Sequence, residues 1–260
     1  MRRIEHGLWT RLLGLVLALG ATGPGAAATF ALVSEDAPGE GLNDPTPVAP
    51  LPDNPGTTRG AQRRFVVEQA FALWGQRIRS NTTILVSVDF EPLPCQSTQA
   101  TLGVGGPTSI FENFPNAPLA DTWYPSALAD ALAGQDLDPG YPDIQISINS
   151  DVDVECGGLS GGWHYGTDAR IHHATDHQYL MLTVLHEVAH GLGFTSSVFL
   201  ATGETPFGHH DVWSHFVVDD VLGKRWSDMT NAERAASAIR YRSVFFDGPY
   251  TQAARKQLVQ

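Results

Sequence analysis

Residues 183–194 read TVLHEVAHGLGF, and this stretch determines the expectations for the rest of the chain. It contains the pattern His-Glu-x-x-His, formed by His186, Glu187 and His190, in a segment that predicts a helix. Residues four apart lie one turn above each other on a helix, so both imidazoles can converge on one metal ion. Glu187 lies beside them as a general base for a zinc-activated water. The pattern therefore predicts a Zn²⁺ site with its own catalytic carboxylate.

The residues around the motif favour a packed helix that ends just beyond it. Apolar side chains recur on one broad face, at Val184, Leu185, Val188, Ala189 and Leu192. A helix with such a face packs into a core, which would hold the two histidines rigidly. Gly193 can take the left-handed conformation that ends a helix. The alternative is an ordinary buried helix whose histidines are only solvated.

A zinc site of this kind needs a third protein ligand and an open position for water. Position 196, where compact zinc-peptidase motifs have a third histidine, is Ser196. The candidates further along the chain are Asp211 or His210 first, then His209, and last His215. Glu233 is a further alternative on a later helix, although Thr230 and Glu233 have the spacing of a capping box. The local sequence leaves these alternatives open.

Residues 1–28 have the features of a signal peptide. Arginines at its start are followed by an apolar run over 12–21 and by three alanines at 26–28 that suit a cleavage site. The run is short for a bilayer, and no later segment approaches membrane length. We therefore expect a secreted protein, extracellular or periplasmic, with no membrane association after cleavage. The alternative is an uncleaved membrane anchor.

The remaining chain divides into two predicted parts. Residues 29–60 are rich in proline, glycine and small polar residues, which predicts a linker or loosely attached leader, with a pro-segment as the alternative. Residues 61–260 are the predicted catalytic domain. The net charge of −12 argues against nucleic acid or anionic lipid as a partner. A protein or peptide substrate is the expected partner.

Periodicity in the second part predicts an α+β domain. Apolar residues at helical spacing predict a helix over 61–79, and alternating apolar residues predict strands over 84–90 and 143–149. A short helix is expected over 126–133, with Ser126 as its cap and Gly134 at its end. Residues 163–165 suggest an edge strand beside the cleft, where an extended peptide would pair. Tyr165 or one of the histidines at 164, 172, 173 and 177 would be placed to polarise a carbonyl.

The chain has two cysteines, Cys95 and Cys156. An even pair in an exported protein predicts a disulfide bond, here between the loops that follow the two predicted strands. The alternative is a free cysteine that acts as a zinc ligand or an inhibitory switch.

Residues 163–248 resemble a family of secreted bacterial zinc metallopeptidase-like proteins. The similarity lies in four blocks, HEVAHGLGF at 186–194, DVWSHFVVD at 211–219, WSDMTNAER at 226–234 and VFFDG at 244–248. The first block is also similar to leishmanolysin-type metzincins, in which the third histidine follows an insertion. In the resembled family an aspartate recurs at the position of Asp211.

This resemblance implies a zincin-like α+β fold with a mixed sheet, Zn²⁺ as cofactor and zinc metalloendopeptidase activity. Metzincins also have a methionine turn below the metal, and Met229 is the methionine that follows the motif. Because Met229 directly precedes the capping box, an ordinary position before a helix is the alternative. The competing function is a non-catalytic zinc-binding or adhesion protein that retains the motif. A zinc hydrolase acting on another amide or an ester is a further alternative.

Overall fold

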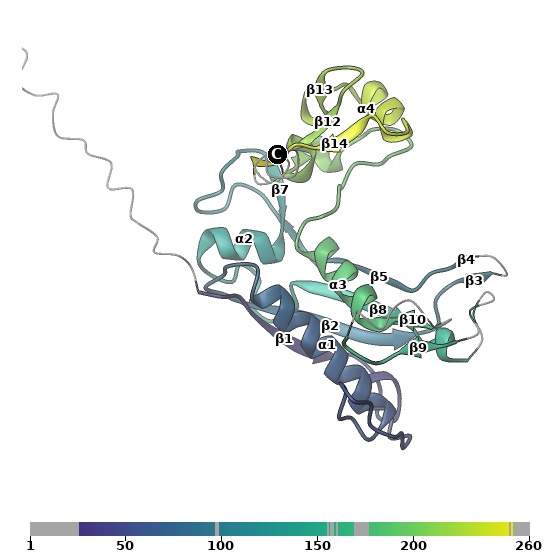
Figure 1. The fold of residues 1–260 in the computed structure, drawn as a ribbon. Coiled ribbons are helices and arrows are strands. Elements are labelled where there is room, and N and C mark those ends of the chain that lie inside the picture. Colours follow the sequence, from purple (N-terminus) through teal and green to yellow (C-terminus); the bar gives the residue numbers. More distant parts are fainter. Residues whose placement is uncertain are drawn as a thin grey trace, which may run out of the picture.

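The computed structural model describes residues 26–96, 99–154, 156, 159, 161–168, 177–249 and 251. These residues form a mixed α+β architecture (Figure 1), which confirms the predicted fold class at that level. The helices are α1 (Arg59–Gly75), α2 (Ser126–Ala133), α3 (Leu180–Gly191) and α4 (Asn231–Ala238). Among the described helices, none has the length and apolar character needed to cross a membrane.

The main sheet has four strands in the order β1-β2-β8-β5. Its members are β1 (Thr29–Ser34), β2 (Thr83–Glu91), β8 (Ile144–Asn149) and β5 (Gly103–Pro107). The first three are parallel, and β5 runs antiparallel to β8 at one edge. Helix α1 packs on β1, α3 packs on β8 and β5, and the two helices contact each other, as Figure 1 shows. The core therefore lies between this helix pair and the sheet.

Segment 29–60 belongs to this fold, which corrects its prediction as a linker or loosely attached leader. It supplies β1. In the proline-rich remainder, polar side chains form hydrogen bonds with backbone groups in place of regular secondary structure. Asp36 accepts hydrogen bonds from the backbone N–H groups of Leu42 (2.7 Å) and Phe90 (2.8 Å). Asn54 is fully buried and donates to the carbonyl of Tyr165 (2.7 Å). The prediction from composition was wrong because the composition of a short segment does not reveal its contacts with distant residues.

Of the predicted signal peptide, only residues 26–28 lie in the described part of the chain. Ala28 is buried, and its N–H donates to the carbonyl of Ile78 (3.2 Å). The predicted cleavage site therefore lies directly against the start of the main sheet.

Several predicted elements are confirmed with small shifts. Strands β2 and β8 cover both predicted strands, whereas α1 begins and ends earlier than predicted. Gly134 ends α2 in the left-handed conformation (φ 72°), as expected. Ser126 does not cap the helix; its hydroxyl donates to the carbonyl of Asp143 (2.7 Å). The predicted Cys95–Cys156 disulfide is present.

Short strands form the smaller sheets. Strands β3 (Cys95–Gln96) and β4 (Gln99–Ala100) pair near the disulfide, and β9 (Trp163–His164) pairs with β10 (Gln178–Tyr179). The sheet β11-β7-β6 joins His210–Asp211, Thr122–Pro125 and Ile110–Phe111. The sheet β13-β12-β14 joins Lys224–Arg225, Val217–Asp219 and Val244–Phe246. The predicted edge strand at 163–165 corresponds to β9, which pairs with β10 outside the main sheet. The edge strand of the main sheet that lies beside the motif helix is β5.

Two buried carboxyl groups, on Asp130 and Asp143, make stability depend on pH. Asp143 is 7% exposed and accepts a hydrogen bond from the N–H of Leu85 (2.8 Å). Burial raises the pKa of Asp143 to about 7, helped by Asp130 and opposed by the Leu85 N–H. Burial also raises the pKa of Asp130. The folded state therefore holds this proton more tightly than the unfolded chain, whose aspartates titrate near pH 4.

The resulting stabilisation is fully present below about pH 4 and is lost as the pH rises to about 7. We expect Asp143→Asn to reduce the change in the free energy of unfolding between pH 4 and 8 by about 2–4 kcal/mol. The amide is neutral throughout this range and still accepts a hydrogen bond from the Leu85 N–H. Urea unfolding between pH 4 and 8 measures the slope. Asp220→Asn, at an exposed aspartate outside this pair's surroundings, is the control and should change it by less than about 0.5 kcal/mol. An unchanged slope in Asp143→Asn would contradict the assignment.

Candidate metal centre

The two histidines of the motif face each other on α3. Their Nε2 atoms are 3.0 Å apart, and the rings are perpendicular with centroids 4.6 Å apart. His186 is exposed and His190 is half-buried. Two imidazole nitrogens bound to one tetrahedral zinc ion lie about 3.4 Å from each other. The pair therefore suits zinc in donor type and in spacing.

The turn after α3 orients His190. Gly193 has φ +110°, and the N–H of Phe194 returns to the carbonyl of Ala189 (2.9 Å). This brings the carbonyl of Phe194 to 2.8 Å from Nδ1 of His190. A proton on Nδ1, donated to that carbonyl, leaves Nε2 with its lone pair for a metal. The glycine predicted to end the helix thus also places a hydrogen-bond acceptor behind a ligand.

Glu187 lies between α3 and the edge strand β5. Its side chain is 6% exposed. A Cβ added at Gly105 would lie 2.7 Å from the Glu187 Cβ, and one at Gly103 would lie 3.2 Å from its Cγ. Burial raises the pKa of Glu187, opposed by His186, His190 and a hydrogen bond from the Gly105 backbone. Two glycines on one face of β5 therefore allow the strand to approach the carboxylate closely.

Two further contacts seat α3. A Cβ added at Gly191 would lie 2.4 Å from Cγ2 of Ile144 in β8, so this glycine lets the helix end approach the sheet. On the other side, Trp74 of α1 donates its indole N–H to the carbonyl of Leu185 (3.2 Å). The position of the motif is thus determined by the sheet and by α1.

Asp211, the leading candidate for third ligand, is buried in β11 and accepts five hydrogen bonds. Oδ2 accepts from Ser196 Oγ (3.0 Å), Ser197 N (2.8 Å), Ser197 Oγ (2.9 Å) and Ser214 Oγ (3.1 Å). Oδ1 accepts from Ser214 N (2.7 Å). In this arrangement the carboxylate joins the segment after α3 to the turn after β11. Oδ1 accepts one hydrogen bond and could still bind a metal, but among the described residues no third His, Cys, Asp or Glu ligand atom lies within 4.8 Å of both motif imidazoles. Coordination of the same zinc ion by Asp211 would therefore require a movement of the segment that carries it.

His210 and His215 lie together on the other side of β11, with ring centroids 6.0 Å apart. Burial lowers the pKa of both. His215 Nε2 is 3.3 Å from Thr122 Oγ1, whereas the buried Nδ1 of His210 has no hydrogen-bond partner among the described residues.

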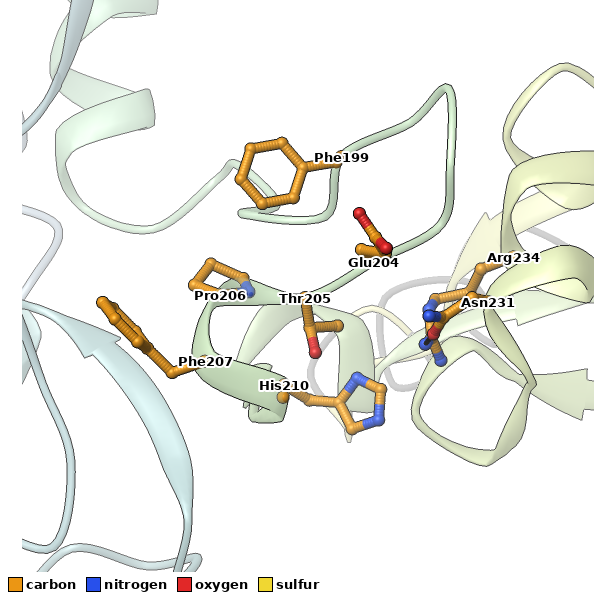
Figure 2. A pocket seen from close by; sticks show the side chains of 9 residues that line it. Phe199, Glu204, Thr205, Pro206, Phe207, His210, Asn231 and Arg234 are labelled. Atoms are coloured by element: carbon orange, nitrogen blue, oxygen red, sulfur yellow. Dashed lines mark hydrogen bonds between the residues drawn. The ribbon is translucent and has the colours of Figure 1, made fainter.

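His210 also lines a cavity of about 550 Å³. Figure 2 shows Phe199 and Phe207 toward one end of it and Asn231 with Arg234 toward the other. The Arg234 guanidinium is already engaged with three backbone carbonyls and with Asn231 Oδ1.

The remaining candidates have other partners. Glu233 completes the predicted capping box with Thr230 and also accepts from Lys224 Nζ (2.6 Å). Lys224 and the Thr230 N–H lower the pKa of Glu233 to about 2. Met229 is buried beside Trp226 and directly precedes the cap of α4. His172 and His173 lie outside the described residues.

His209 belongs to a different group of possible ligands. In the described part of the chain, one set of three His, Cys, Asp or Glu ligand atoms lies within 4.8 Å of one another, and it consists of Glu112, Asp121 and His209. The sequence prediction missed Glu112 and Asp121, which lie in a glycine- and proline-rich stretch without regular periodicity. No local signal identifies them, because the sheet β11-β7-β6 brings them to His209 from about 90–100 residues away.

The chain matches no protein-family model, and its comparison with curated proteins and with solved structures gives no significant match. The resemblance described above therefore remains a prediction from the quoted blocks.

Proposed function

We propose that this protein is a secreted zinc-dependent peptidase with a zincin-like domain. The observation that carries the proposal is the histidine pair, with Nε2 atoms 3.0 Å apart on α3 and with the buried Glu187 beside it. Without a metal, the same 3.0 Å separation is an N–H···N hydrogen bond between the two imidazoles; the buried carboxylate beside the pair is what favours a zinc site over that hydrogen bond alone. The Cys95–Cys156 disulfide is compatible with the oxidising compartment that a secreted protein enters.

His186 and His190 would hold the zinc ion, and the Phe194 carbonyl keeps His190 in the tautomer that coordinates through Nε2. When bound, zinc supplies Lewis-acid activation of water and of the scissile carbonyl. Glu187 takes a proton from the attacking water on its carboxylate and delivers it to the nitrogen of the leaving amine. Its burial and its contact with β5 keep the carboxylate fixed and weakly solvated, which suits a base that acts near neutral pH.

The edge strand β5 provides a place for an extended substrate. It pairs with β8 on one side, and its other edge faces no strand in the described part of the main sheet. Extended peptides bind such edges by adding a strand. Because Gly105 of β5 touches Glu187, a peptide paired there would pass close to the proposed base.

Asp211 remains the candidate for third ligand on the basis of the resemblance. The five hydrogen bonds it accepts support a second role, in which it holds the segment after α3 against β11. Asp211→Asn separates these roles in a zinc titration. A ligand role predicts a large loss of zinc affinity, whereas a purely structural role predicts a lower melting temperature with zinc affinity retained.

Zinc removal is the first test of the function. A chelator should lower kcat/KM for a fluorogenic peptide by about 100-fold or more, because Lewis-acid stabilisation contributes several kcal/mol, and added Zn²⁺ should restore it. His186→Ala/His190→Ala should lose the same activity and one zinc ion per chain. A protein that binds zinc at this pair without cleaving peptides would be the non-catalytic alternative. A wild-type chain whose zinc content is unaffected by the double substitution would contradict the site.

A further inference from the structure

The sheet β11-β7-β6 brings three charged side chains to one place. β11 pairs with β7 in the register His210 to Thr122, and β6 pairs with β7 in the register Phe111 to Tyr124. His209 and Asp121 directly precede the first of these pairs, and Glu112 follows the end of β6. The three residues therefore come from three strand ends that meet at the same end of this sheet.

Their ligand atoms are close enough to share one ion. All three lie within 4.8 Å of one another, and His209 Nδ1 is 2.5 Å from Glu112 Oε2. Asn113 holds the Asp121 carboxylate by donating its amide to Oδ1 (3.1 Å), and it accepts from the Asp121 N–H (3.0 Å). Asp121 is exposed, and its other carboxylate oxygen accepts no hydrogen bond from the described residues, so it is open to solvent or to an ion.

The segment that directly precedes His209 in the chain is also fixed. The indole N–H of Trp123 donates to the carbonyl of Pro206 (3.0 Å), which ties the segment carrying His209 to β7. The rings of Trp123 and His209 lie 6.2 Å apart. The hydrogen bond from Trp123 fixes the backbone before His209 and does not involve Glu112.

An ion pair between His209 and Glu112 accounts for two of the three groups. A protonated His209 also attracts Asp121, but one positive charge faces two carboxylates there, in a chain of net charge −12. Two carboxylates at this separation repel each other, and a divalent cation between them would remove that repulsion. One imidazole nitrogen with two carboxylate oxygens is a donor set that suits Zn²⁺, whereas Ca²⁺ and Mg²⁺ prefer oxygen alone.

We propose that Glu112, Asp121 and His209 form a second divalent-metal site, with Zn²⁺ as its ion, separate from the histidine pair on α3. The bound ion would fasten the segment around His209 to the turn between β6 and β7. His209, which the sequence offered as a ligand of the motif site, belongs to this second site instead.

The test is a zinc titration of the full chain in the His186→Ala/His190→Ala background, which removes the motif site. Equilibrium dialysis with metal analysis should find one Zn²⁺ per chain in this background and two in the wild type. His209→Gln or Glu112→Gln added to it should weaken zinc binding by at least about 100-fold, because losing a direct ligand exceeds the 10- to 100-fold effect of losing its supporting hydrogen bond. Zinc should raise the melting temperature of the parent and not of these variants.

Glu204→Gln in the same background is the matched control, since it removes an exposed carboxylate from the same segment. It should bind zinc like its parent. Asp121→Asn, which keeps the size of the side chain, serves as the test if circular dichroism shows that His209→Gln does not fold. If the double-alanine parent binds no zinc, or if the three ligand variants bind zinc as tightly as the Glu204→Gln control does, the proposal is overturned. The three residues then form an ion pair only. Because the motif site is absent throughout, this result is independent of peptidase activity.

Discussion

Glu187→Gln is expected to lower kcat/KM for peptide cleavage by about 10²- to 10⁴-fold, the usual contribution of a general acid–base residue. Glutamine has the shape of the glutamate but accepts no proton at neutral pH. The side chain is buried against Gly105, so the amide should occupy the same position. Zinc content should stay at the wild-type level, because the two imidazole nitrogens of His186 and His190 are unchanged. Steady-state kinetics together with metal analysis measure both quantities.

Glu204→Gln is the control for this substitution. The Glu204 carboxylate is exposed and accepts a hydrogen bond from the Thr202 hydroxyl. The control should leave both kinetics and zinc content within about twofold of wild type. Wild-type activity in Glu187→Gln would exclude the residue as the base. Loss of zinc together with activity would instead indicate that Glu187 coordinates the ion.

Gly105→Ala is expected to damage both stability and activity, although it adds a single methyl group. The new Cβ would lie 2.7 Å from the Glu187 Cβ and 3.1 Å from the Glu187 carbonyl oxygen, so β5 and α3 must move apart. Overpacking of this kind typically costs about 1–3 kcal/mol. A displacement of about 1 Å at a catalytic group can lower activity by about 100-fold. Urea unfolding and peptide cleavage should both show the loss.

The neighbouring Gly106 provides a matched control on the same strand. A Cβ added there meets no atom within 4 Å, because its side-chain position faces away from α3. Alanine should be neutral at Gly106 or stabilise by about 0.5–1 kcal/mol, since glycine is the less favourable residue within a strand. If Gly105→Ala behaves like Gly106→Ala, the close approach of β5 to Glu187 does not position the base.

The features predicted from the sequence are those encoded in short windows. Helical spacing of apolar residues identified α1 and α3, alternation identified β2 and β8, and the capping box at Thr230 and Glu233 identified the start of α4. Each of these patterns, whether a period or a fixed spacing, is contained in a short stretch of the chain. The same local period places His186 and His190 on one face of a helix.

The errors arose where contacts across the chain outweigh local composition. Thr29–Ser34 lies in a proline-rich region but gains a full register of backbone pairing with β2. The sequence also does not indicate that Ser196, Ser197 and Ser214 donate hydrogen bonds to Asp211, whose role as a zinc ligand stays a prediction from the resemblance and from its polar neighbours. Composition describes neither a partner strand nor the donors that surround a carboxylate.

Periodicity and residue type are local properties, and they suffice to predict the mixed α+β class, the disulfide, and a helix with two histidines on one face beside a glutamate. The surroundings of that helix depend on contacts between distant parts of the chain. The glycine face of β5 brings the strand against Glu187, the turn at Gly193 brings a carbonyl to His190, and the sheet β11-β7-β6 gathers Glu112, Asp121 and His209. These contacts depend on strand register and loop path, which are set by packing between residues far apart in the chain.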